Sequence, residues 1–237
     1  DFNDVETTGA RALLQIDLND NWTVTPGLMY QQQEADGLWA HDPEDAGDLE
    51  VVRFFPDGQD EDWLQSILTV EGSIADNLDF VYAGAHLDRD VDSVYDYTGY
   101  AQYLEELYAY YGYACYHYDA MGNCADPSQF VNSDQRFSRM SHEVRLQSSG
   151  EGRFQWILGG FAQKQVHDFD LQWVVPDMNP AGSVIENGTT VWQTKQVRTD
   201  RDIAAFGEVA AFFPYVLSMA VFLGKTRLID NMILSEA

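Results

Sequence analysis

Apolar and polar residues alternate most clearly over residues 137–167, which are predicted to form two strands joined by a short turn. In the first strand one parity is mostly apolar and the other polar; the first set is Met140, His142, Val144 and Leu146, and the second is Ser141, Glu143, Arg145 and Gln147. Successive strand side chains point to opposite faces, so one face is apolar and the other carries charge. Residues 148–152 form a turn rich in residues that tolerate positive φ. Each strand has about 12–15 residues, against ~5–6 in soluble sheets.

The same organisation recurs along the chain. Besides this hairpin, strands are expected over residues 8–18, 22–34, 62–73, 78–90 and 202–212, and residues 215–227 could supply another. Short turns of about 3–5 residues alternate with loops of about 25–40 residues, although loops above ~15 residues are uncommon in compact soluble domains. The long loops are 36–60, 93–134 and 168–198. Long strands with short turns on one side and long loops on the other are typical of outer-membrane β-barrels.

The predicted fold class is therefore all-β: an antiparallel, up-and-down transmembrane β-barrel segment of about seven or eight long strands, incomplete as a barrel. We assign residues 1–212 to this segment and 213–237 to an atypical tail with a possible eighth strand. Pro26 predicts a bulge or a weakly paired position. The apolar run 209–224 could be a membrane helix, but it is short of ~20 residues and contains Pro214, which favours broken strands.

Charge narrows the choice of partners. The chain has 39 acidic and 13 basic residues and a net charge of −26, which excludes nucleic acid as a partner because phosphate binding needs a basic surface. The acidic loop 34–62 could bind cations or a cationic metal complex, or could simply be solvated. The chain starts at Asp1 without a signal segment, so we expect a processed protein or a piece of a longer one.

Cys115 and Cys124 lie in a stretch rich in Tyr, Gly and Asp. A local disulfide in an oxidising compartment is the favoured interpretation, and two free thiols are the alternative. Zinc-site spacing is missing despite the nearby His117. No phosphate loop, Ser-His-Asp arrangement or HExxH pattern stands out, so we expect no catalytic residues, no metal site, no cofactor and no enzyme activity.

Five segments together resemble the barrel of TonB-dependent outer-membrane receptors, most closely the iron-complex receptors. They are WTVTPGLMYQQQ at 22–33, LDFVYAGAHLDRDVD at 78–92, SHEVRLQSS at 141–149, FQWILGGFAQK at 154–164 and AAFGEV at 204–209. The resemblance covers roughly residues 8–212. Such receptors have a plug domain, roughly twenty-two strands and a closing aromatic residue. This chain has none of these, which implies a central barrel fragment.

The resemblance implies a place in the bacterial outer membrane, in contact with the lipid bilayer and lipopolysaccharide. It implies active uptake of a scarce small-molecule metal complex, most closely a ferric-siderophore type, energised by TonB through the missing plug region. Nothing in this chain would perform the energised step.

Loop and wall residues are the candidate sites. Ten of the thirteen tyrosines fall in residues 93–134, and Tyr suits binding loops. Ligand contact is predicted for Trp39, His41, Tyr97, Tyr100, Tyr110, Tyr113 and His117, with packing of the loops or an interfacial aromatic belt as the alternative. Residues 100–111 could form a short helix within this loop. Residues expected to line the lumen are Arg11, Gln15, Asp17, Glu71, Glu143, Arg145, Gln147 and Glu208.

Two other functions remain open. A small eight-stranded outer-membrane barrel with a structural or adhesive role would need residues 215–227 to pair with the first strand. A barrel-embedded hydrolase using a pair such as His41 and Asp42 is less favoured, because no activated nucleophile is visible.

Overall fold

The chain forms one long antiparallel sheet. The structure, a computed structural model, describes residues 4–37, 46–150, 152–212 and 216–223, with side chains as far as Ala210. Its elements are β1 (Asp4–Leu13), β2 (Ile16–Asn19), β3 (Trp22–Asp36), β4 (Gly58–Ala75), β5 (Leu78–Asp96), α1 (Thr98–Tyr110), β6 (Phe130–Ser148), β7 (Phe154–Val174), the 3-10 helix η1 (Pro180–Gly182), β8 (Thr190–Phe212) and β9 (Val216–Leu223).

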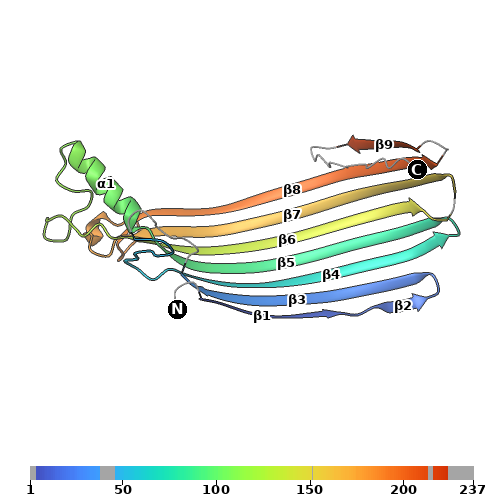
Figure 1. Ribbon diagram of the computed structural model, residues 1–237, viewed down its shortest axis with the longest axis horizontal. Helices are drawn as coiled ribbons and strands as arrows, with labels where there is room; N and C mark the ends of the chain where they lie inside the picture. Colours follow the sequence, from blue (N-terminus) through green and yellow to red (C-terminus); the bar gives the residue numbers. More distant parts are fainter. Residues whose placement is uncertain (1–3, 38–45, 151, 213–215, 224–237) are drawn as a thin grey trace.

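Neighbours in sequence are neighbours in the sheet. The order is β1-β3-β4-β5-β6-β7-β8-β9, and β2 pairs with β3 beyond the end of β1. Figure 1 shows the strands side by side, with short turns at one end and α1 with the long loops at the other. Within the described residues β1 and β9 are edge strands that do not pair with each other, so the sheet is an open meander. The predicted all-β antiparallel organisation is confirmed.

The strands are longer than predicted towards the loops. β6 starts at Phe130 rather than residue 137, β7 continues to Val174, and β8 starts at Thr190 rather than residue 202. The three loops are correspondingly shorter, at 37–57, 97–129 and 175–189. The extension of β8 is largely polar on both faces, so alternation marks it weakly. In the extension of β7, by contrast, Phe169, Leu171 and Trp173 alternate with polar residues, a signal that the sequence analysis missed. Cross-strand backbone hydrogen bonds hold both extensions regardless of side-chain polarity.

Two other predictions need correction. Residues 8–18 are not one strand, because β1 ends at Leu13 and β2 begins at Ile16. The gap lies opposite Pro26, which has no N–H to donate, although Leu14 N still donates to Pro26 O over 3.0 Å. On the β1 side this agrees with the weak pairing predicted for Pro26, whereas on the β4 side Pro26 pairs in register with Leu68. The membrane-helix alternative for 209–224 is wrong, since β8 and β9 pair there through Phe212 and Val216.

Directly paired residues of an antiparallel sheet share a face, so the register sorts the strands into two faces. One, the apolar face, carries rows such as Val24, Val70, Tyr82 and Val144. The other, the polar face, carries rows such as Thr23, Glu71, Val81 and Arg145. The two faces are the physical basis of the alternation read from the sequence.

The loop end is tied together by hydrogen bonds. α1 confirms the helix predicted near residues 100–111, and its buried Thr98 exchanges hydrogen bonds with the backbone of Gln129, both at 3.3 Å. Asn179 N donates to Tyr118 O over 2.7 Å, which joins two loops. Among the described residues no helix is long and apolar enough to cross a membrane.

Candidate functional site

An exposed apolar surface is the first feature that points to function. It occupies five successive rows of the apolar face, which start at Trp22, Val24, Pro26, Leu28 and Tyr30 of β3; we call it the apolar belt. Large exposed side chains in it are Leu28, Tyr30, Leu64, Leu68, Met140, Val144, Leu158 and Ile203. Ile203, in the middle row, is 84 % exposed.

The height of the apolar belt follows from strand geometry. Five rows span the nine residues from Trp22 to Tyr30, or roughly 30 Å at ~3.3 Å per residue. With a tilt of ~40°, this is about 23 Å of height, close to the ~25 Å apolar band of outer-membrane barrels. Within the belt the polar His142 ring is satisfied by the Tyr82 hydroxyl, 2.8 Å from Nδ1. A surface of this extent is uncommon on a water-exposed monomer.

Above the belt, towards the loops, the same face becomes acidic. Five carboxylates lie directly opposite one another on five neighbouring strands and form the acidic row: Glu34, Asp60, Asp92, Asp134 and Asp170. The row ends at Lys195, whose Nζ lies 3.3 Å from an oxygen of Asp170. Like charges directly opposite each other destabilise a sheet unless water screens them.

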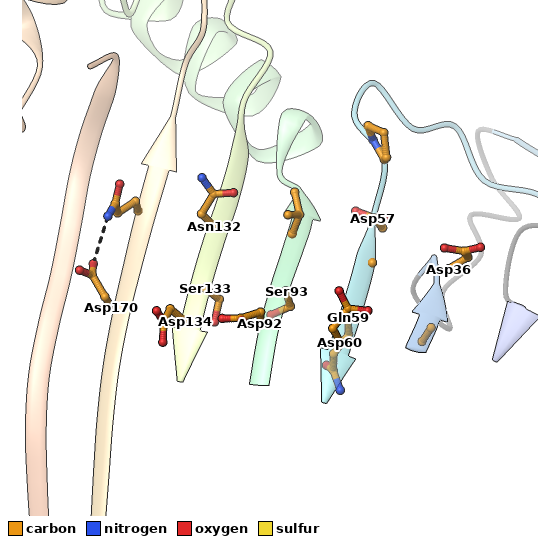
Figure 2. Close-up of a pocket in the computed structure, with 15 residues that line it drawn as sticks. Asp36, Asp57, Gln59, Asp60, Asp92, Ser93, Asn132, Ser133, Asp134 and Asp170 are labelled. Carbon is orange, nitrogen blue, oxygen red and sulfur yellow. Dashed lines mark hydrogen bonds between the residues drawn. The ribbon is translucent and has the colours of Figure 1, made fainter. Parts of the chain in front are cut away.

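A cleft of about 500 Å³ lies beside this row and is lined by Asp36, Asp57, Asp60, Asp92, Asp134 and Asp170 among others. Figure 2 shows these carboxylates arriving from successive strands. In the described part of the chain no group of three or more His, Cys, Asp or Glu side chains could hold a metal ion. The cleft is therefore a negatively charged surface.

The residues predicted to line a lumen share the polar face. The register puts Asp17, Glu71 and Arg145 in one row, with Glu143 in the next and Arg11 further towards the loops. Two pockets at the short-turn end bring others together. One, of about 350 Å³, is lined by Gln15, Glu71 and Gln147, and another, of about 320 Å³, by Gln147 and Glu208.

The sequence analysis missed an aromatic and cationic row on the polar face. Its members pair directly across five strands: Trp63, Arg89, Phe137, His167 and Arg198. Glu61 holds the Arg89 guanidinium with two hydrogen bonds of 2.8 Å. The Phe137 and His167 rings stack at 4.0 Å, and Arg198 lies over the ring of Phe169 at 4.9 Å. Only the register reveals this row, because its members are far apart in sequence.

The predicted loop tyrosines fall into two clusters. The rings of Tyr97 and Tyr100 are tilted by 49° with centroids 5.2 Å apart, whereas Tyr113 packs on Tyr108 with centroids 5.4 Å apart. Tyr110, at 82 % exposure, is the most exposed of the predicted tyrosines. These contacts agree with the loop-packing alternative and leave exposed rings for a ligand. The predicted ligand contacts Trp39 and His41 lie outside the described residues. So does Asp42, which the hydrolase alternative combined with His41.

His117 is half-buried against Tyr116, with ring centroids 4.1 Å apart. Burial lowers the pKa of His117, and the nearby Glu105 carboxylate opposes that shift. The ring is therefore neutral at pH 7. A neutral imidazole in this position packs the loop.

The predicted disulfide is not formed, because both cysteines are free in the structure. Cys115 is buried and Cys124 is exposed, and a hydrogen bond with Cys115 raises the pKa of Cys124 to about 11. Backbone pairing of Tyr118 with Cys124 closes this loop without a covalent bond. The Cys124 thiol is consequently protonated at neutral pH, which makes it a poor nucleophile.

Comparison with known proteins adds no relative. No protein-family model matches the chain, and no curated protein matches it.

Proposed function

We propose that this chain is part of the wall of an outer-membrane active transporter of the TonB-dependent type, which takes up a scarce solute such as a ferric-siderophore complex. The observation that carries the proposal is the apolar belt. Its large apolar side chains are exposed together on the apolar face, and its height of about 23 Å is close to that of an outer-membrane band. The five resembling sequence segments supply the link to this class of receptor.

The parts of the wall then have separate tasks. The apolar face contacts lipid, and the polar face lines a wet interior that holds the plug and the solute path. The loops with α1 stand at the outer mouth, where exposed rings such as Tyr110 and Tyr113 meet the solute. TonB acts through the plug, which lies in another part of the whole receptor.

The open order of the sheet supports a larger barrel over a closed eight-stranded one. The eight-stranded alternative requires β1 to pair with β9, and among the described residues these two strands are opposite edges of the sheet.

Uptake by cells tests the proposal. Iron-limited cells without the gene and cells carrying the full-length protein are compared for accumulation of radiolabelled ferric siderophores and for protein in the outer-membrane fraction. We expect saturable accumulation only with the protein. Protein that fractionates with the soluble extract, or no accumulation of any ferric complex, would contradict the proposal.

The loop residues are tested in the same assay. Replacing residues 99–127 by a short Gly-Ser linker should raise the half-saturating solute concentration at least about tenfold, since one lost hot-spot cluster is worth ~1.4 kcal/mol or more. Tyr110→Ala with Tyr113→Ala should give part of that loss, whereas the matched Phe pair keeps the rings. Unchanged affinity in the linker variant would remove the loop from the binding site.

A further inference from the structure

Two basic residues face each other on the apolar face without an acidic partner. Lys164 of β7 pairs directly with Arg201 of β8, and both side chains are exposed. Side chains directly opposite on neighbouring strands have Cβ atoms about 4.5–5.5 Å apart, so the two cations repel. An isolated pair of this kind costs stability unless an anion lies between them.

The protein itself does not supply that anion in the part that the structure describes. Other basic side chains do form ion pairs: Arg53, Arg89, Arg136, Arg145 and Lys195 each have a carboxylate within range. Neither Lys164 nor Arg201 has an ion pair among the described residues, although the chain carries a net charge of −26. Their neighbours on this face are Met140, Ala162, Val166, Thr199 and Ile203, none of them acidic.

The position of the pair fits a headgroup. Lys164 and Arg201 belong to the row that starts at Leu28, the fourth of the five belt rows counted from the short turns. Long basic side chains at such a depth extend to the interface while their stems stay in the apolar layer. The hydroxyl of Thr199 lies one row nearer the loops on the same strand face.

We propose that Lys164 and Arg201 bind a phosphate group of an anionic lipid, the phosphorylated lipid A of lipopolysaccharide, in the leaflet beside the long loops. The inference rests on the proposed function, which places this face in the outer membrane. Arg binds two phosphate oxygens at once and Lys adds a point charge, a common pairing for phosphate. The acidic row begins further up the same face, so the pair is a local positive site below a negative rim.

Lipid binding by the intact protein tests this assignment. The full-length protein is purified in mild detergent and titrated with bisphosphorylated lipid A, with phosphatidylethanolamine and with inorganic phosphate, using native mass spectrometry. We expect Lys164→Gln with Arg201→Gln to weaken lipid A binding several-fold. The control Lys195→Gln, on a side chain already paired with Asp170, should leave it unchanged, and Arg201→Lys should retain most of it.

Every outcome of this titration supports or refutes the proposed site. Equal lipid A affinity of the double variant and the wild type overturns it, and so does a loss of affinity in the Lys195→Gln control as large as that in the double variant. Displacement of lipid A by millimolar inorganic phosphate would identify a soluble-anion site and overturn the lipid source. A protein that stays soluble without detergent would refute the proposed function itself, whereas a membrane protein with unaltered lipid A binding refutes only this inference. If the double variant fails to fold, Lys164→Gln and Arg201→Gln are titrated separately, and each should weaken lipid A binding.

Discussion

Single glycines on the strands make room for aromatic rings of the neighbouring strand. A Cβ built on Gly159 would lie 2.2 Å from the ring of Phe206, its direct partner on β8. The adjacent Gly160 points to the other face, and its nearest neighbour would be 3.9 Å away. A side chain larger than glycine is therefore excluded at position 159 and accommodated at position 160, although the two are consecutive in sequence.

Gly159→Ala should therefore destabilise the protein by about 1–3 kcal/mol, the usual cost of overpacking, because the Phe206 ring must move. Gly160→Ala is the matched control and should change stability by less than about 0.5 kcal/mol. Urea unfolding of the protein refolded into lipid vesicles measures both. Equal effects of the two variants would contradict the packing described here.

The stability of the loop that contains His117 should depend on pH. Burial lowers the pKa of its ring, so the unfolded loop binds a proton more readily than the folded one. The stabilising effect is complete above the unfolded pKa of about 6.5 and is lost as the pH falls below it. Limited proteolysis of the loop 111–129 should accelerate between pH 7 and pH 5, and His117→Gln should flatten that change. A rate independent of pH in the wild type would contradict it.

At the scale of elements, α1 is most deeply buried in its first turn. Ala101 is 1 % exposed and Thr98 equally buried, whereas Tyr103 and Tyr110 face solvent. The first turn thus holds the helix on the strand ends, and further along the helix Tyr108 packs against Tyr113 of the following loop. The helix has no side-chain N-cap, which increases its reliance on the buried first turn.

Ala101→Asp should release α1, since a carboxylate at this site would be buried without a partner. Protease cleavage within residues 98–110 should become faster, while the thermal transition of the sheet stays within about 2 °C of the wild type. Tyr103→Asp introduces the same charge at an exposed position of the same helix and should leave cleavage unchanged. Cleavage that is equally slow in both variants would show that the buried turn does not hold the helix.

The strands, their faces and the short turns could be predicted from the sequence because alternation requires one apolar face. Strand ends could not, since stretches such as Asp60 to Asp62 are polar on both faces. Parity correctly put Glu71 and Arg145 on one face of the sheet, and their place in a lumen stays a prediction. The row with Arg89 and Phe137 was not found, because its assembly depends on a register that the sequence does not reveal.

At the scale of the whole molecule, the belt makes a prediction that distinguishes lipid from water around the sheet. Ile203 is 84 % exposed in the middle row, so a charge there would be nearly neutral for a sheet in water. In a membrane, Ile203→Arg should cost about 2–4 kcal/mol. The neighbouring Asp202→Arg, on the polar face, is the matched control and should cost less than about 1 kcal/mol.

Refolding into vesicles followed by denaturant unfolding gives both free energies. A neutral Ile203→Arg variant would mean that the belt is not in contact with lipid, and the transport proposal would lose its principal support.

The acidic row has a consequence that extends beyond the sheet. Five carboxylates on neighbouring strands, with the carboxylate-lined cleft beside them, give the loop-side end of the apolar face a strongly negative potential, which decays into the medium over a Debye length of about 8 Å at physiological salt. Counter-ions and protons accumulate in that layer, so its local pH is lower than that of the surrounding medium. Negatively charged macromolecules are repelled from the flank before they touch it, and the chemistry at this rim takes place in a thin, cation-rich film.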